Sequence, residues 1–147
     1  MFGCKKKFLD VKIRNFEPYT DNDHTLDRKN DLLDEIRPKI NENKVKKDCE
    51  EKLFSLKIIY YLNKNTKITG QYEKDLDNMS KIVCDTLTDY LSAQDKQNNK
   101  KTGLGLMRDD EDIHELHLVK KFVETDSERG LDIKLYKWSD KKQSDII

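Results

Sequence analysis

The sequence predicts a single α+β domain, and three observations lead to this fold class. The chain has 147 residues, a length that suits one domain with one hydrophobic core. Apolar and polar residues alternate in some short stretches, as in strands, and apolar residues recur every three or four positions in others, as in helices. In chain order these patterns predict strand, helix, helix-like segment, strand, helix, strand and strand.

Composition narrows the class of protein. Charged residues make up 39% of the chain, but 29 basic residues balance 29 acidic ones, so the net charge neither favours nor excludes a nucleic-acid partner. The three cysteines, Cys4, Cys49 and Cys84, are odd in number and form no Cys-x-x-Cys motif. This usage indicates reduced thiols in a cytoplasmic protein rather than a disulfide framework or a zinc site. No apolar run approaches the ~20 residues of a membrane helix, and we expect no membrane segment or signal peptide.

Two strands are predicted in the first half of the chain. Residues 8–16 alternate, with Leu9, Val11 and Ile13 on one side, and residues 53–62 form the most apolar stretch. We expect residues 53–62 to be an internal strand of a sheet.

The segment between these strands contains a predicted helix and an ambiguous stretch. Residues 26–40 have apolar positions at helical spacing and are interrupted near Pro38. Residues 41–52 are highly polar and suit either a solvated helix or a flexible connector.

The last third of the chain contains two further predicted strands. Residues 113–123 and 131–138 alternate, and the turn-like residues 126–130 between them predict a hairpin. Residues 92–106 are polar and are expected to form a mobile loop within a domain that spans residues 1–138. The polar tail at 139–147 is expected to be frayed.

The stretch at residues 73–91 carries the strongest functional pattern. Two carboxylates, Asp75 and Asp77, precede a helix whose polar side continues with Lys81 and Asp85 at four-residue intervals. The apolar residues of this predicted helix form the opposite face: Met79, Ile82, Val83, Leu87, Tyr90 and Leu91. A capped helix with a solvated charged stripe would explain the same pattern.

A second acidic cluster follows at residues 109–112, immediately before the strand predicted at 113–123. Four consecutive carboxylates repel one another unless they are solvated or share a cation. Magnesium prefers such oxygen ligands, so the two acidic clusters together indicate a possible metal site.

The combined pattern resembles the RusA family of Holliday junction resolvases. It consists of Asp75-Leu76-Asp77-Asn78, then Lys81 and Asp85, then the pair Asp109-Asp110 before a strand that carries Lys120. The local match covers residues 74–87 and 108–120, and the order of elements extends it over much of the chain. Met79 and Ser80 differ from the usual family pattern, and the spacer between Asp85 and Asp109 is longer than is usual.

The resemblance implies an architecture and an activity. The expected fold is a mixed β-sheet flanked by helices, in an intertwined homodimer. The expected activity is that of a Mg²⁺-dependent endodeoxyribonuclease that uses one or two ions per site. Such an enzyme resolves four-way DNA junctions by paired symmetric nicks in recombination and repair, in the nucleoid or in a phage-infected cell.

The resemblance also implies roles for individual residues. Asp75, Asp77 and Asp110 are the expected metal ligands, and Lys81 is the expected catalytic cation. Asn78, Asp85 and Asp109 are expected to surround and orient these ligands. Five lysines are expected to contact DNA: Lys74, Lys96, Lys100, Lys101 and Lys120.

Two alternatives remain compatible with the sequence. One is a non-catalytic module that keeps the fold and binds DNA junctions or proteins. The other is a small regulatory protein whose acidic clusters bind Ca²⁺ for a structural purpose.

Overall fold

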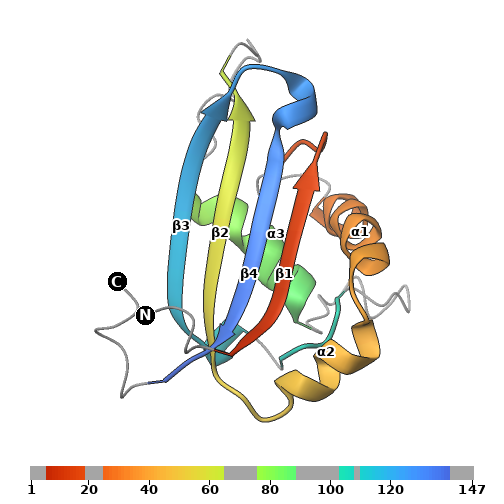
Figure 1. Cartoon of the computed structure of the whole chain (residues 1–147), viewed down its shortest axis with the longest axis vertical. Coiled ribbons are helices and arrows are strands. Elements are labelled where there is room, and N and C mark those ends of the chain that lie inside the picture. Colours follow the sequence, from red (N-terminus) through yellow and green to blue (C-terminus); the bar gives the residue numbers. More distant parts are fainter. Residues whose placement is uncertain (1–5, 19–24, 65–75, 89–102, 108–109, 140–147) are drawn as a thin grey trace.

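The computed structural model describes residues 6–18, 25–64, 76–88, 103–107 and 110–139, with backbone only for residues 25–29 and 76–78. Within these ranges the chain forms one α+β domain with a four-stranded mixed sheet and three α-helices, which confirms the predicted fold class at this level (Figure 1).

The sheet has the strand order β1-β4-β2-β3. The strands are β1 (Lys7–Arg14), β2 (Phe54–Asn63), β3 (Ile113–Val123) and β4 (Gly130–Lys137). β4 pairs antiparallel with both β1 and β2, whereas β2 and β3 are parallel. The prediction of an internal strand at residues 53–62 is confirmed, since β2 has a neighbour on each side.

The helices begin and end where the local chemistry predicts. α1 (Thr25–Ile36) passes into a short 3-10 turn, Arg37–Lys39, at Pro38, which cannot continue an α-helix. α2 (Glu42–Cys49) begins after Asn41, whose side chain accepts a hydrogen bond of 3.2 Å from the backbone N–H of Lys44. The ambiguous stretch at residues 41–52 is therefore mainly helical. α3 is the helix Leu76–Leu87.

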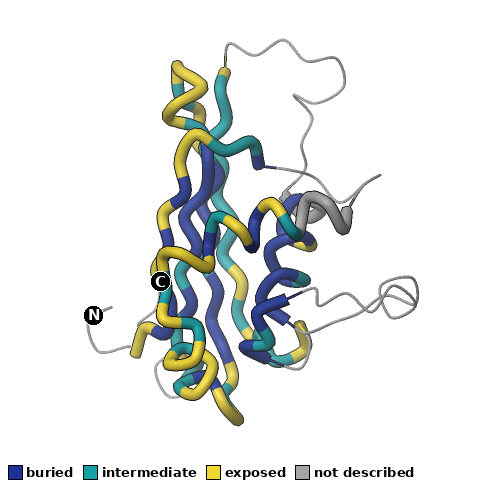
Figure 2. Tube along the Cα trace, turned by 90° about the vertical axis from the view of Figure 1, so that its right-hand side faces the viewer, coloured by how far each residue is buried: buried dark blue, intermediate teal, exposed yellow. Residues whose placement is uncertain are grey.

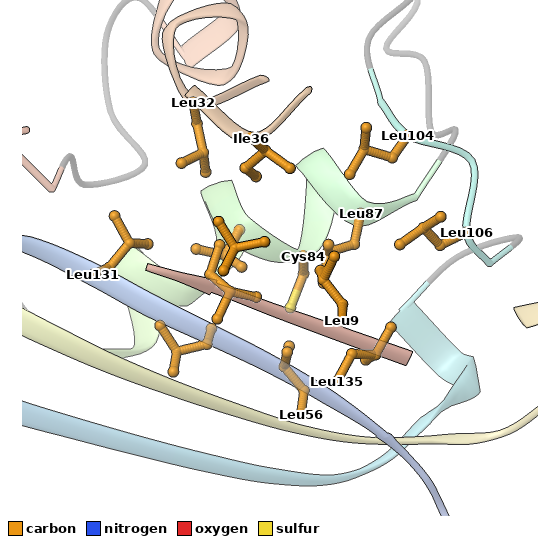
Figure 3. Packing of buried hydrophobic residues seen from close by; sticks show 14 of the residues in the cluster. Leu9, Leu32, Ile36, Leu56, Cys84, Leu87, Leu104, Leu106, Leu131 and Leu135 are labelled. Carbon is orange, nitrogen blue, oxygen red and sulfur yellow. The ribbon is translucent and has the colours of Figure 1, made fainter. Parts of the chain in front are cut away.

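The hydrophobic core lies between one face of the sheet and the helices. α3 crosses behind the strands in Figure 1, and α1 packs on α3 and β1. In Figure 2 the buried positions run along the strands and along α3. Figure 3 shows how leucines from β1, β2 and β4 meet Leu87 and Cys84 of α3 and Leu32 and Ile36 of α1. Burial of these side chains is the main source of stability for the domain.

The predicted hairpin of β3 and β4 is wrong. The two strands do not pair, because β2 lies between them and the turn at residues 126–128 leads the chain past the end of β2. The reason lies in the relative burial of the two strands. Leu131, Ile133 and Leu135 of the central strand β4 are buried in the core, whereas β3 is an edge strand with Leu116 and Phe122 exposed.

None of the helices that the structure describes is both long enough and apolar enough to cross a membrane.

Candidate functional site

The helix α3 connects two parallel strands and thereby carries the polar residues of the central motif. A parallel pair needs a crossover connection, and α3 lies in the connection from β2 to β3. Met79, Ile82 and Val83 are buried against the sheet side, and Ser80 and Thr86 are buried as well. From residue 79 to residue 88, Lys81 is the one exposed position, and Asp85, one turn later, is partly buried.

The first predicted ligands lie at or before the start of this helix. Asp77 and Asn78 fall in the first turn of α3, where the structure describes the backbone alone. Asp75 precedes the helix and lies outside the described residues, as does Lys74. The helical backbone places Asp77, Lys81 and Asp85 on one side of α3, as the sequence pattern predicts.

The second acidic cluster is held close to the other end of α3. Residues 103–107 run along this end: the backbone N–H of Leu104 donates to the carbonyl of Thr86 at 2.8 Å, and that of Leu106 donates to Leu87 at 2.9 Å. Leu104 and Leu106 are buried in the core. The last residues of the loop predicted at 92–106 are therefore firmly packed, whereas residues 92–102 lie outside the described part of the chain.

Gly103 makes this close approach possible. A Cβ atom at position 103 would overlap the backbone carbonyl oxygen of Thr88, so only glycine fits. The chain then reaches the 3-10 turn Asp110–Asp112, which leads directly into β3. Asp110 is exposed, and Asp109 is outside the described residues.

The surroundings of Cys84 include a carboxylate from each acidic segment. Burial, with smaller contributions from the negative charges of Asp110 and Asp85, raises the pKa of this thiol to about 12. The thiol therefore stays protonated near neutral pH and is not a nucleophile. Asp85 and Asp110, which are far apart in the sequence, lie near the same atom.

The position of Asp110 has a consequence for the predicted ligand set. Eight helical residues separate Asp77 from Asp85, an axial distance of about 12 Å at 1.5 Å per residue. Asp110 approaches the half of α3 that carries Cys84 and Asp85. Asp85, which was predicted to surround the ligands, is thus the described carboxylate on the same half of α3 as Asp110.

The donor chemistry of these residues suits a hard cation. Carboxylate oxygens are the ligands that Mg²⁺ prefers, and two of them with bound waters can hold the ion. Among the described residues there is no group of three or more His, Cys, Asp and Glu side chains that could hold a metal ion. The full predicted set of Asp75, Asp77 and Asp110 extends beyond that part of the chain and stays a prediction.

A cleft of about 780 Å³ lies beside the acidic turn, between the end of α2 and residues 105–107. Its lining includes Asp112 and two lysines, Lys46 and Lys52. Glu50 and Glu51 line it as well, so charges of both signs lie next to the acidic turn. The sequence did not single out the lysines, because they occur in a polar stretch where a solvated role explains them equally well.

The remaining predicted DNA-contacting lysines divide between described and undescribed segments. Lys120 lies on β3 beside Tyr60, on the helix-covered side of the sheet, and is partly buried. Lys96, Lys100 and Lys101 are outside the described residues.

No protein-family model and no curated protein matches this chain. The RusA resemblance therefore rests on the sequence motif alone.

Proposed function

We propose that the protein is a Mg²⁺-dependent endonuclease that resolves four-way DNA junctions, similar in its site to RusA resolvases. The observation that supports this proposal most is the meeting of the two acidic segments. The turn at Asp110 and the motif helix α3, separated by a long spacer, both place a carboxylate near Cys84. A solvated acidic stripe would not need this convergence.

Phosphodiester hydrolysis explains the residue types in the motif. Bound Mg²⁺ supplies an activated water and neutralises charge on the reacting phosphate. Asp75 and Asp77 would hold an ion at the start of α3, and Asp110 would hold a second ion on the side of Asp85. Lys81 projects from the exposed side of α3 and provides a positive charge for the developing negative charge on the phosphate.

The substrate proposal includes a homodimer. A four-way junction has approximate twofold symmetry, and its resolution without gaps needs two matched nicks. A dimer with twofold symmetry presents two identical sites in a fixed relation. The proposed protein therefore acts as a homodimer on branched DNA.

The experiment is cleavage of a synthetic four-way junction in Mg²⁺ and, separately, in Ca²⁺. Wild type is expected to nick two strands in Mg²⁺ and none in Ca²⁺, because Ca²⁺ accepts a looser geometry that does not align the attacking water. Asp77→Asn keeps the shape of the side chain and removes a ligand charge, so it is expected to abolish cleavage while leaving junction binding intact.

Asp34→Asn is the matched control, because Asp34 is an exposed carboxylate on α1 and the change removes the same charge. It is expected to cut at the wild-type rate. Cleavage by Asp77→Asn at that rate would contradict the assignment of the metal ligand. Tight junction binding by the wild type without cleavage in Mg²⁺ or Mn²⁺ would favour the non-catalytic binding module.

A further inference from the structure

The sheet has a second face, opposite the helices, that the proposed active site does not use. Figure 1 views the sheet from this side, and no described helix lies across it. Strand alternation places the side chains that flank the buried core positions on this face. We call it the open face and define it by these strand residues: Lys7, Asp10, Lys12, Arg14, Ser55, Lys57, Ile59, Tyr61, Glu115, His117, Val119, Lys121, Asp132, Lys134 and Tyr136.

Two of the three carboxylates of the open face are paired with a lysine or an arginine. Asp132 is buried and accepts hydrogen bonds from Arg14 at 2.8 Å and from the hydroxyl of Tyr61 at 2.9 Å. Asp10 pairs with Lys7 at 3.0 Å. The third, Glu115, accepts a hydrogen bond of 2.7 Å from the hydroxyl of Ser55 and lies 3.0 Å from Nε2 of His117.

Four lysines of the open face have no ion pair within the described part of the chain: Lys12, Lys57, Lys121 and Lys134. They come from all four strands. With strands about 4.8 Å apart, three intervals span a patch about 14 Å wide. Because the whole chain has a formal charge of zero, this patch is a local positive excess on a neutral protein.

The centre of the patch brings two like charges together. Lys57 and Lys134 are directly opposite each other in the antiparallel pair of β2 and β4, while Asp10, which pairs with Lys7, is opposite Lys134 on β1. Like charges in this position destabilise a sheet. A bound anion between them would relieve the repulsion.

The open face does not suit a second copy of the chain. A twofold interface places a patch on itself, and here it would bring the Lys57 and Lys134 pair towards an identical pair. A membrane is also a poor match, because Ile59, the apolar residue next to Lys57 on this face, is 8% exposed and does not project.

We propose that the open face binds the phosphodiester backbone of a DNA duplex. The unpaired lysines on four strands are complementary in sign to the phosphates of DNA, which carries about one negative charge per 1.7 Å of axis. The aromatic rings favour backbone contact over base stacking, because Arg14 lies 4.2 Å from the ring centre of Tyr61 and Lys7 lies 5.8 Å from that of Tyr136. The choice of DNA as the ligand rests on the proposed function. The duplex arms of a four-way junction extend beyond its centre, so they can reach a second surface of the protein.

The test measures binding in EDTA, where no cleavage occurs. Anisotropy of a labelled duplex and of a labelled four-way junction is followed against NaCl concentration for four proteins. These are wild type, Lys57→Gln/Lys134→Gln, the charge-preserving Lys57→Arg/Lys134→Arg, and Lys39→Gln/Lys47→Gln. The last pair is the matched control, because Lys39 and Lys47 are exposed and lie near and on α2, away from the sheet.

Loss of two phosphate contacts is expected to lower the salt slope of log K by about 1.8, at about 0.9 per contact. Lys57→Gln/Lys134→Gln is therefore expected to show the lower slope and about tenfold weaker binding at moderate salt. The arginine variant and the control pair are expected to keep the wild-type slope. The glutamine variant is also expected to melt at or above the wild-type temperature, since it removes the opposed charges.

An unchanged slope for Lys57→Gln/Lys134→Gln would overturn the inference, as would an equal loss in the control pair. Binding of wild type to phosphatidylserine vesicles but not to DNA would overturn it too. A lower salt slope in the glutamine variant, together with no junction cleavage by wild type in Mg²⁺, would contradict the proposed function alone. Junction cleavage with a normal slope in the glutamine variant would contradict this inference alone.

Discussion

Single residues decide what the motif helix can do. Lys81 is exposed on α3, whereas its neighbours Ser80 and Ile82 are buried. A lysine in this position is free to reach a phosphate, and its place one turn from Asp85 also permits an ordinary surface ion pair. The two roles predict very different effects of a Lys81 substitution on the rate of junction cleavage.

Lys81→Ala is expected to slow single-turnover junction cleavage by about a hundredfold or more, because a positive charge next to the reacting phosphate is lost. An i, i+4 surface pair is worth only ~0.3–0.5 kcal/mol, so stability is expected to change little. The rate is measured with Mg²⁺ and enzyme saturating, so that binding does not limit it. Lys47→Ala on α2 is the control, and a Lys81→Ala rate within threefold of wild type would remove Lys81 from the catalytic set.

The buried thiols give the fold a defined response to alkaline pH. Burial raises the pKa of Cys49 and of Cys84 from 9.0 to about 12. Below pH 9 both the folded and the unfolded chain keep these protons. Between pH 9 and 12 the unfolded chain releases them first, so the free energy of unfolding falls as pH rises.

The double variant Cys49→Ala/Cys84→Ala is expected to lose less of its stability between pH 9 and pH 11 than wild type does. Urea unfolding at pH 7, 9, 10 and 11 measures this difference. The comparison of each protein with its own value at pH 7 removes the cost of the lost side-chain packing. Parallel declines for the two proteins would show that the thiols titrate normally.

At the scale of elements, the end of α3 and residues 103–107 act as one unit. Backbone hydrogen bonds to Thr86 and Leu87 fix the segment that leads to Asp110. Gly103 lies against the carbonyl of Thr88, so this position controls the approach of the acidic turn to α3.

Gly103→Ala is expected to destabilise the protein by about 3 kcal/mol, because two backbone segments must separate to admit a Cβ atom. It is also expected to reduce junction cleavage at temperatures where the protein remains folded, since the Asp110 turn shifts with residues 103–107. Thermal unfolding and cleavage are measured on the same preparation. An unchanged melting temperature would show that this packing is absent in solution.

Local sequence patterns predicted most helices and strands but not which strands pair with each other. The strand limits at residues 113–123 and the end of the first helix at Pro38 follow from alternation and from the chemistry of proline. The pairing of β3 with β2 rather than β4 depends on which strand has more apolar surface to bury, and this depends on the whole core. The packing of Leu104 and Leu106 was missed because two leucines in a polar stretch give no periodic signal.

The candidate site was predictable in its residue types and not in its spatial arrangement. The sequence predicted that Asp110 works with the motif helix, and the described geometry places Asp110 near Cys84 and Asp85. Which carboxylate of α3 lies with Asp110 depends on where residues 103–107 dock along the helix. A linear motif does not contain that information.

At the scale of the whole molecule, the two faces of the sheet have separate roles. The helix side holds the core and the meeting point of the acidic segments, and the open face presents lysines without ion pairs in the described chain. We therefore propose chemistry on one side of the sheet and binding of a DNA arm on the other. The central claim is that the first side belongs to a junction-resolving nuclease.

The most direct test of this claim is cleavage of a supercoiled plasmid that extrudes a cruciform. Two nicks within one binding event give linear plasmid, whereas a single nick relaxes the plasmid, reabsorbs the cruciform and leaves a nicked circle. The account predicts linear product from wild type in Mg²⁺, and no product from Asp110→Asn, with Asp34→Asn behaving as wild type. Intact plasmid, or nicked circles formed equally from a plasmid without the cruciform, would contradict it.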